Sequence, residues 1–167
     1  SGFTCPHGVW AEPWPDYNQQ FKDMLDIAYD KYGMLTEVTI FGGAGESFPT
    51  YAGREAHCQR ILDLIVGREH KIAFLEVANE GWQTGFDYPQ GVTDMRNLCQ
   101  YLADRTSVPV AISATPWGMY PDPNQTLVEL YSGSAADLAT EHFERNTWTF
   151  EGGWLPVRDC WRVENAV

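Results

Sequence analysis

In three segments of the chain, apolar residues recur every three or four positions, which is the spacing of one face of an α-helix. Gly33 and Gly67 follow the first two segments, and glycine commonly ends a helix. Thr93 precedes the third segment and is its expected N-cap. The residues on these faces are Phe21, Met24, Leu25 and Ala28, then Cys58, Ile61, Leu62 and Ile65, and finally Met95, Leu98, Cys99 and Leu102.

Short apolar runs without helical spacing alternate with these helices and are predicted to be strands. They comprise residues 37–41, 72–78 and 108–114, with 137–143 as a weaker candidate. Strands about 30 to 40 residues apart, with helices between them, are typical of βαβ units. Nearly continuous apolar strands indicate a parallel sheet that is covered on both faces. The fold class is therefore predicted to be α/β with parallel βα repeats, in one domain or a segment of one.

The remaining segments are predicted to be mostly loops. Residues 1–16 are rich in Pro, Trp and Gly and are expected to form an ordered aromatic loop, and residues 42–50 a second loop. A short helix is expected over 127–131, and residues 146–167 are expected to form an aromatic loop followed by a helix.

Length and charge limit the classes of partner. The chain has 167 residues, enough for one domain with a core. Its formal net charge of −12 would repel polyanions, so we expect neither nucleic acid nor an anionic membrane surface as a partner. The longest apolar runs are too short to cross a bilayer, so no membrane span is expected.

The cysteine pattern argues against a structural metal site. No two of the four cysteines form a CxxC pair, so we expect no zinc. Cys58 and Cys99 lie on apolar helix faces and are expected to be buried free thiols, whereas Cys5 and Cys160 lie in loop-like ends and could pair. The loop at 42–47 lacks the pattern of a phosphate or dinucleotide site, so no cofactor is expected. The compartment stays open, with a secreted or extracellular location slightly favoured.

Every predicted strand ends in polar or unusual residues. The first three strands are followed by Gly42–Glu46, Asn79–Trp82 and Thr115–Gly118, and the fourth ends in Glu141–Asn146. In parallel α/β folds, ligands bind at the carboxyl ends of the strands. The sequence therefore predicts a site at this rim.

The pair Asn79-Glu80, at the end of a strand and with Trp82 close behind, resembles the Asn-Glu pair of the retaining glycoside hydrolase clan built on the TIM barrel, which includes cellulase-like and mannanase-like enzymes. That pair ends the fourth strand of the clan's barrel. "LTEVTIFGG" resembles the third strand, "VPVAISATPWG" the fifth and "ATEHF" the sixth. The resemblance covers residues 17–146 and implies a partial (β/α)8 barrel that comprises about strands 3 to 6.

The resemblance also implies roles for residues. Glu80 would be the general acid/base, because a glycosidic oxygen is a poor leaving group that must be protonated as its bond breaks. Asn79 would bond the sugar 2-hydroxyl. His142 matches a histidine of the clan near the nucleophile, although Glu144 stands where the clan usually has Tyr. The other residues expected to contact substrate at this rim are Trp82, Trp117 and Glu141.

Each of these assignments has a structural alternative. Glu80 could be a solvated loop acid, and His142 a packed histidine. Glu76 lies four residues before Glu80 and shares its strand parity, so it is expected to point inward as half of a structural buried pair. His57 and His70 are expected to be surface residues.

The resemblance leaves the catalytic pair incomplete. A retaining glycosidase needs two carboxylates about 5 to 5.5 Å apart, and the clan's nucleophile is a Glu at the end of strand seven. Only four strands are predicted here, whereas a whole barrel takes about 250 residues, so the nucleophile is expected to lie outside this chain. The sequence is then a segment of a longer chain, half of a barrel closed by a second copy or another chain, or a compact open sheet.

Three functions follow from these expectations. The first is a glycoside hydrolase-like protein that cleaves a β-linked glycan of an oligo- or polysaccharide. The alternative is a non-catalytic carbohydrate-binding or structural barrel within a larger assembly. A hydrolase of another class on an open sheet is the third, although the chain has no Gly-x-Ser-x-Gly elbow.

Overall fold

The fold is known from a computed structural model, which describes residues 3–4, 10–11, 15–114 and 123–140. Its strands are β1 (Phe3–Thr4), β2 (Trp10–Ala11), β3 (Thr36–Phe41), β4 (Ile72–Ala78) and β5 (Val110–Ser113). Its α-helices are α1 (Tyr17–Asp26), α2 (Ala44–Ser47), α3 (Tyr51–Ile65), α4 (Gln90–Ala103) and α5 (Pro123–Tyr131). A π-helical turn, Ile27–Lys31, extends α1, and a 3-10 turn, Glu69–Lys71, leads into β4.

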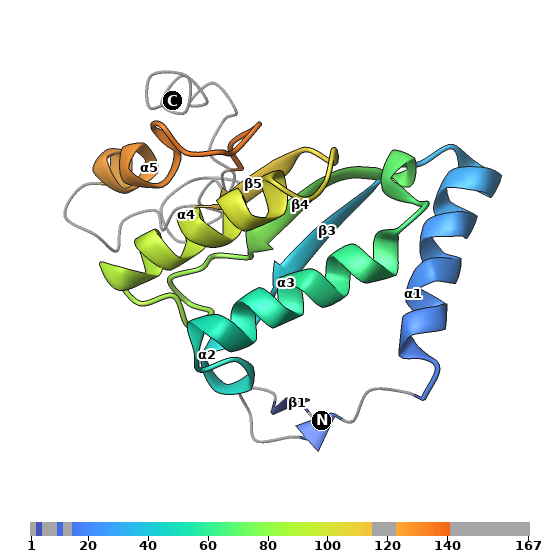
Figure 1. The fold of residues 1–167 in the computed structure, drawn as a ribbon, viewed down its shortest axis with the longest axis horizontal. Helices are drawn as coiled ribbons and strands as arrows, with labels where there is room; N and C mark the ends of the chain where they lie inside the picture. The colour runs from blue at the N-terminus through green and yellow to red at the C-terminus, as the bar shows by residue number, and fades with distance from the viewer. Residues whose placement is uncertain (1–2, 5–9, 12–14, 115–122, 141–167) are drawn as a thin grey trace, which may run out of the picture.

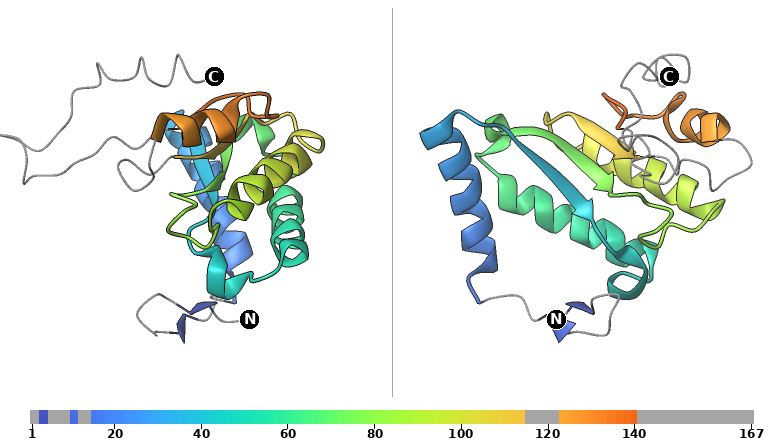
Figure 2. Two further views of the ribbon diagram at one scale, coloured as in Figure 1. Left: turned by 90° about the vertical axis from the view of Figure 1, so that its left-hand side faces the viewer. Right: turned by 180° about the vertical axis from the view of Figure 1, so that it is seen from behind.

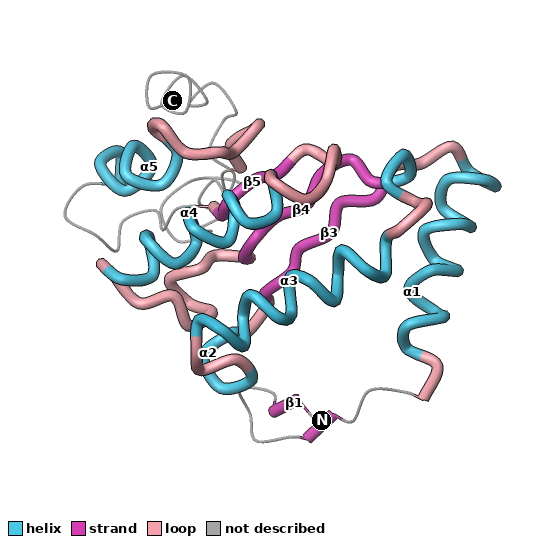
Figure 3. The backbone as a smooth tube through the Cα atoms, viewed as in Figure 1, coloured by secondary structure: helices cyan, strands magenta, loops and turns pink. Residues whose placement is uncertain are grey.

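Strands β3, β4 and β5 form a parallel sheet in which neighbours in sequence are neighbours in space (Figures 1 and 3). Thr39 pairs with Glu76, which pairs with Ala111, so these three side chains share one face of the sheet. The adjacent row, Val38, Leu75 and Val110, points to the other face. Strands β1 and β2 form a separate antiparallel ribbon. The expected α/β class with parallel βα repeats is therefore confirmed.

Helices α3 and α4 cover one face of this sheet, and no helix in the described part of the chain covers the other (Figure 2). Val38, Leu75 and Val110 are buried against this helical layer. The burial of apolar side chains between sheet and helices is the main source of stability here. The helix residues that belong to the same core cluster are Cys58, Leu62, Ile65, Met95, Leu98, Cys99 and Leu102.

The boundaries of the central elements follow the sequence pattern closely. Strand β4 has the predicted bounds, β3 begins one residue earlier, and β5 is shorter than the predicted run at 108–114. Gly33 and Gly67 follow their helices with φ of +65° and +77°, the left-handed conformation that glycine adopts readily. Buried free thiols are confirmed at Cys58 and Cys99, where burial raises the pKa of each thiol to about 12.

The predicted N-cap at Thr93 is wrong. Helix α4 begins at Gln90, directly after Pro89, so Thr93 lies inside the first turn. A proline supplies a helical φ without needing a hydrogen-bond partner for its nitrogen, so Pro89 starts the helix earlier than the apolar periodicity indicates. The side chain of Gln90 bonds Asp94 one turn later, at 2.8 Å.

Two segments predicted to be loops contain short regular elements. Residues 42–50 include α2, and the first 16 residues include the paired strands β1 and β2. The short helix expected at 127–131 begins at Pro123. These elements are too short for a periodic pattern to reveal them.

The fourth strand expected at 137–143 does not form in its described part, residues 137–140. Val110 N donates to the side-chain Oδ2 of Asp137 at 2.9 Å, and Asp137 N donates to Val110 O at 2.8 Å. Because a carboxylate takes the place of the backbone carbonyl, the pairing does not continue as a ladder. Residues 141–143 lie outside the described residues.

Helix α1 buries less of its predicted apolar face than expected. Leu25 is fully buried, whereas Met24 is 45% exposed. The helix lies at the edge of the domain beside β3 (Figure 1), and Arg68 and Lys71 bind Asp26 on it at 2.8 and 3.0 Å. These ion pairs hold the pKa of Asp26 near 2. Charge and a narrow apolar contact therefore hold this helix in place.

Candidate functional site

The segment that carries Asn79 and Glu80 leaves the carboxyl end of the central strand β4. Asn79 N donates to Phe41 O of β3 at 3.0 Å, which extends the parallel pairing by one residue. Glu80 then has φ of +44°, in the left-handed region, and within the described residues no other non-glycine residue has a positive φ. The chain therefore turns sharply at the residue that the sequence singled out.

Both side chains of the pair are accessible to a ligand. Asn79 is exposed and Glu80 is partly exposed. Gln83 Nε2 donates to Glu80 Oε2 at 3.0 Å, and Gln83 N donates to Glu80 O at 2.7 Å. Gln83, the last residue of this turn, therefore orients the carboxyl group of Glu80.

Ser113 at the end of β5 anchors the residue that follows Glu80. Gly81 N donates to Ser113 Oγ at 2.9 Å. Ser113 is fully buried, and its own hydroxyl donates to Ala114 O at 3.2 Å. Ser113 was not among the predicted site residues. The sequence feature that could have identified Ser113 is its polar side chain at the end of an otherwise apolar strand. In a parallel sheet, that strand end lies beside Asn79-Glu80.

A second residue that was not predicted, Arg54, ties three segments together around this turn. Its guanidinium donates to Phe48 O at 3.0 Å, to Gly85 O at 2.7 Å and to Asp94 Oδ2 at 3.2 Å, and it lies 4.3 Å from the ring centre of Phe86. Arg54 is only 7% exposed. Arg54 lies four residues before the buried Cys58 and therefore on the apolar face of α3. A charged residue on an apolar helix face is the sequence feature that could have identified it.

The loops after β3 and β4 touch each other at their glycines. Gly85 has φ of +99°, and a Cβ there would overlap the backbone of Gly45. Ala44 N and Gly45 N both donate to Thr84 O, at 2.5 and 3.1 Å. The glycine-rich loop after β3 therefore packs backbone to backbone against the loop that carries Glu80.

Trp82 is half-buried, and its indole Nε1 is a buried atom with no hydrogen-bond partner among the described residues. Part of the ring is therefore open and part of it is packed into the protein. Trp117, Glu141 and His142, which complete the predicted rim, lie outside the described residues.

Glu76 points away from the helical layer, as its parity predicted. It is 2% exposed, and its carboxyl accepts hydrogen bonds from Thr39 Oγ1 at 3.0 Å and Thr140 Oγ1 at 2.6 Å. Both of these donors are hydroxyl groups, and the charged partner expected for Glu76 stays a prediction. Carboxylates at the short distance of the second contact form strong charge-assisted bonds.

The prediction for His70 is confirmed, because it is exposed, whereas the prediction for His57 is wrong. His57 is half-buried, and its ring stacks on Phe48 at 4.4 Å between centroids. Burial lowers the pKa of His57. His57 directly precedes the buried Cys58 in α3, so it lies at the margin of the apolar face of that helix.

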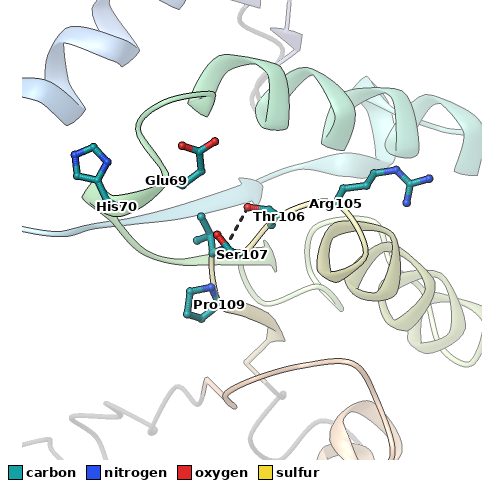
Figure 4. Close-up of a pocket in the computed structure, with 7 residues that line it drawn as sticks. Glu69, His70, Arg105, Thr106, Ser107 and Pro109 are labelled. Atoms are coloured by element: carbon teal, nitrogen blue, oxygen red, sulfur yellow. Dashed lines mark hydrogen bonds between the residues drawn. The ribbon is translucent and has the colours of Figure 1, made fainter.

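A hollow of about 560 Å³ lies at the opposite edge of the sheet, at the amino ends of β4 and β5 (Figure 4). In Figure 4, Arg105 extends away from the other labelled residues, and its guanidinium lies 3.7 Å from the ring centre of Tyr101. The described lining contains no Trp, Tyr or Phe. Glu69, His70, Arg105, Thr106, Ser107, Val108 and Pro109 line the hollow.

We favour the carboxyl edge as the functional site, because ligands of parallel α/β proteins bind there. Within the described residues, no helix has the length and apolar composition needed to span a bilayer. Comparison with protein family models, with curated proteins and with solved structures found no match.

Proposed function

We propose that the protein is a glycoside hydrolase-like protein that cleaves a β-linked glycan by a retaining mechanism, with Glu80 as the acid/base and Asn79 as a contact of the sugar 2-hydroxyl. The observation that carries this proposal is the left-handed backbone of Glu80 at the carboxyl end of the central strand. A carboxyl group at that place is presented to the rim where ligands bind.

The backbone of Glu80 supports a functional role because the left-handed conformation is unfavourable for a residue with a Cβ. It costs roughly 1 to 2 kcal/mol, and such conformations cluster at active sites. Glycine would remove most of this cost. A glutamate in this conformation is therefore more consistent with a need for its carboxyl group than with a solvated loop acid.

The chemistry assigns two successive tasks to the same carboxyl group. Glu80 first donates its proton to the glycosidic oxygen as the bond to the leaving group breaks, and then, as a carboxylate, it accepts a proton from the attacking water. Gln83 restricts the orientation of the group by bonding Oε2 at 3.0 Å. In this proposal the nucleophile does not come from residues 1–167.

The arrangement of the sheet supports a barrel as the finer description of the fold. Consecutive strands are neighbours, and α3 and α4 lie on the same face, whereas doubly wound sheets carry helices on both faces. The face without described helices carries the polar row of Thr39 and Glu76. We propose that β3, β4 and β5 correspond to the third, fourth and fifth strands of a (β/α)8 barrel, with this face inside.

The experiment is a comparison of Glu80→Gln with Glu69→Gln on aryl and alkyl β-glycosides. Glu69 lines the hollow at the opposite edge and is a matched carboxyl-to-amide control. Removal of a general acid reduces the rate by roughly 10²- to 10⁴-fold. The loss of kcat/KM in Glu80→Gln should be largest with alkyl leaving groups and smallest with dinitrophenyl, because kcat/KM reports the first step, in which a weakly basic leaving group needs little protonation.

Full activity of Glu80→Gln on alkyl glycosides would remove the acid/base assignment. Oligosaccharide binding without turnover in the unaltered protein would favour a non-catalytic carbohydrate-binding barrel instead. Loss of activity in Glu69→Gln, with Glu80→Gln intact, would move the site to the opposite edge.

A further inference from the structure

We propose that Tyr131 is a positioning residue for Glu80, acting through Ser113 and Gly81. The inference rests on the proposed function, because it concerns the carboxyl group assigned there as acid/base. Tyr131 lies at the end of α5, an element that no sequence pattern connects with the rim.

The hydroxyl of Tyr131 is buried and lies between the end of β5 and the segment after α5. It donates to Ser113 O at 2.8 Å and accepts from Ser113 N at 3.0 Å and from Thr140 N at 3.2 Å. Thr140 Oγ1 lies 3.3 Å from the same hydroxyl, so the one donor proton and two lone pairs of the phenol all have partners. Burial raises the pKa of Tyr131, so the phenol keeps the proton that it donates to Ser113.

These bonds add a phenol partner to the backbone of Ser113, which also pairs with Ala78 of β4. The described residues 137–140 form no ladder with β5 beyond Val110. A buried backbone amide or carbonyl without a partner is costly. One phenol therefore holds both backbone groups of the last residue of β5 at a fixed place.

Ser113 passes this restraint to the turn at Glu80. Its hydroxyl proton is directed to Ala114 O, so Oγ presents a lone pair to Gly81 N at 2.9 Å. The N–H of Gly81 belongs to the peptide unit that follows Glu80, so its direction depends on the ψ angle of Glu80. Holding that N–H therefore restricts the left-handed conformation of Glu80.

The same network returns to strand β4. Thr140, which bonds Tyr131, donates from Oγ1 to Glu76 Oε1 at 2.6 Å. Glu76 lies in β4, and Glu80 lies two residues after the end of that strand. The hydrogen bonds thus form a path from Glu76 in β4 to Gly81 in the loop that follows it, and a change at Tyr131 reaches Glu80 through β5 without altering any group that touches substrate.

The test compares Tyr131→Phe with Tyr101→Phe. Tyr101 is a matched control because its hydroxyl donates to Gln59 at 2.8 Å between α3 and α4, away from the turn at Glu80. Hydrogen exchange of the Gly81 amide, measured by NMR, should be faster in Tyr131→Phe by roughly three- to tenfold, the effect of losing one hydrogen bond. In Tyr101→Phe it should be unchanged.

A second readout separates positioning from stability alone. In Tyr131→Phe, kcat on an alkyl glycoside should fall with KM nearly unchanged. The reason is that a carboxyl group held less firmly spends less time in the orientation that protonates the leaving group, whereas the contacts that bind substrate are unaltered. Ser113→Ala removes the acceptor for Gly81, together with the hydroxyl bond to Ala114 O, and should reproduce the faster exchange and the lower kcat. Combining it with Tyr131→Phe should add little.

The outcomes distinguish this inference from the proposed function. If Glu80→Gln loses activity while Tyr131→Phe and Ser113→Ala match Tyr101→Phe in exchange and in kcat, the inference is overturned and the function stands. Unchanged Gly81 exchange in Ser113→Ala overturns it as well. If Glu80→Gln is fully active, the function falls and the positioning role falls with it.

Discussion

The guanidinium of Arg54 on α3 and the carboxylate of Asp94 on α4 form an ion pair at 3.2 Å that is largely buried. The same guanidinium holds the carbonyl oxygens of Phe48 and Gly85. Arg54 therefore connects the two helices with the loop that follows β3 and the loop that carries Glu80.

Replacing Arg54 with Met should lower the free energy of unfolding by about 3 kcal/mol, because a buried carboxylate then loses its ionic partner. Two carbonyl groups lose hydrogen-bond donors as well. Urea unfolding would measure the change. Arg60→Met, at an exposed position of the same helix, should change stability by less than about 0.5 kcal/mol. Equal effects in the two variants would contradict the structural role of Arg54.

Gly85→Ala should be strongly destabilising. The new Cβ would overlap the backbone of Gly45, and φ of +99° is unfavourable for alanine. Overpacking and backbone strain together should cost about 3 kcal/mol. Gly42→Ala is the control, because a Cβ there meets nothing within 4 Å. Thermal unfolding midpoints should fall for the first variant and stay nearly constant for the second.

Glu80→Gly should leave the free energy of unfolding within about 0.5 kcal/mol of the unaltered protein, or raise it. Relief of the left-handed backbone offsets the greater freedom of glycine in the unfolded chain. Asp87→Gly, at an exposed position of the same loop with an ordinary φ, should lose about 0.5 to 1 kcal/mol. Chemical denaturation of both variants measures the difference, and an equal loss would argue against strain at Glu80.

The ion pairs of Asp26 should make stability depend on pH in the acid range. Hydrogen bonds from Arg68 and Lys71 lower the pKa of Asp26 to about 2, whereas an aspartate in an unfolded chain titrates near 3.9. The unfolded state therefore takes up a proton at a higher pH than the folded state. The contribution of Asp26 is present above about pH 4 and is lost as pH falls toward 2.

Urea midpoints measured between pH 5 and pH 2 would test this dependence. Asp26→Asn should be less stable than the unaltered protein at pH 5, and the difference should shrink at pH 2. Asp16→Asn, at an exposed position before α1, is the control and should show no such convergence. A constant difference between Asp26→Asn and the unaltered protein at all pH values would contradict the role of the ion pairs.

The candidate site divides into a part that was predicted and a part that was not. Asn79 and Glu80 were identified because they interrupt an apolar pattern at the end of a strand, and that interruption is visible along the chain. Arg54 and Tyr131 were missed because their partners lie far away in sequence: Arg54 bonds Asp94, 40 positions on, and Tyr131 bonds Ser113, 18 positions back. Thr93 was misassigned because proline and apolar spacing indicated different helix starts.

The sequence by itself determined the alternation of helices and parallel strands, because the periods of apolar burial are set by local backbone geometry and can be read residue by residue. It also determined where β4 ends and that an amide and an acid follow it. Only the tertiary structure decided how that turn is held, with Glu80 in a left-handed conformation, Gly81 bonded to Ser113 and Arg54 buried beneath neighbouring loops. The physical reason is that these contacts join segments whose approach depends on the packing of the whole sheet and its helices, which no local pattern encodes.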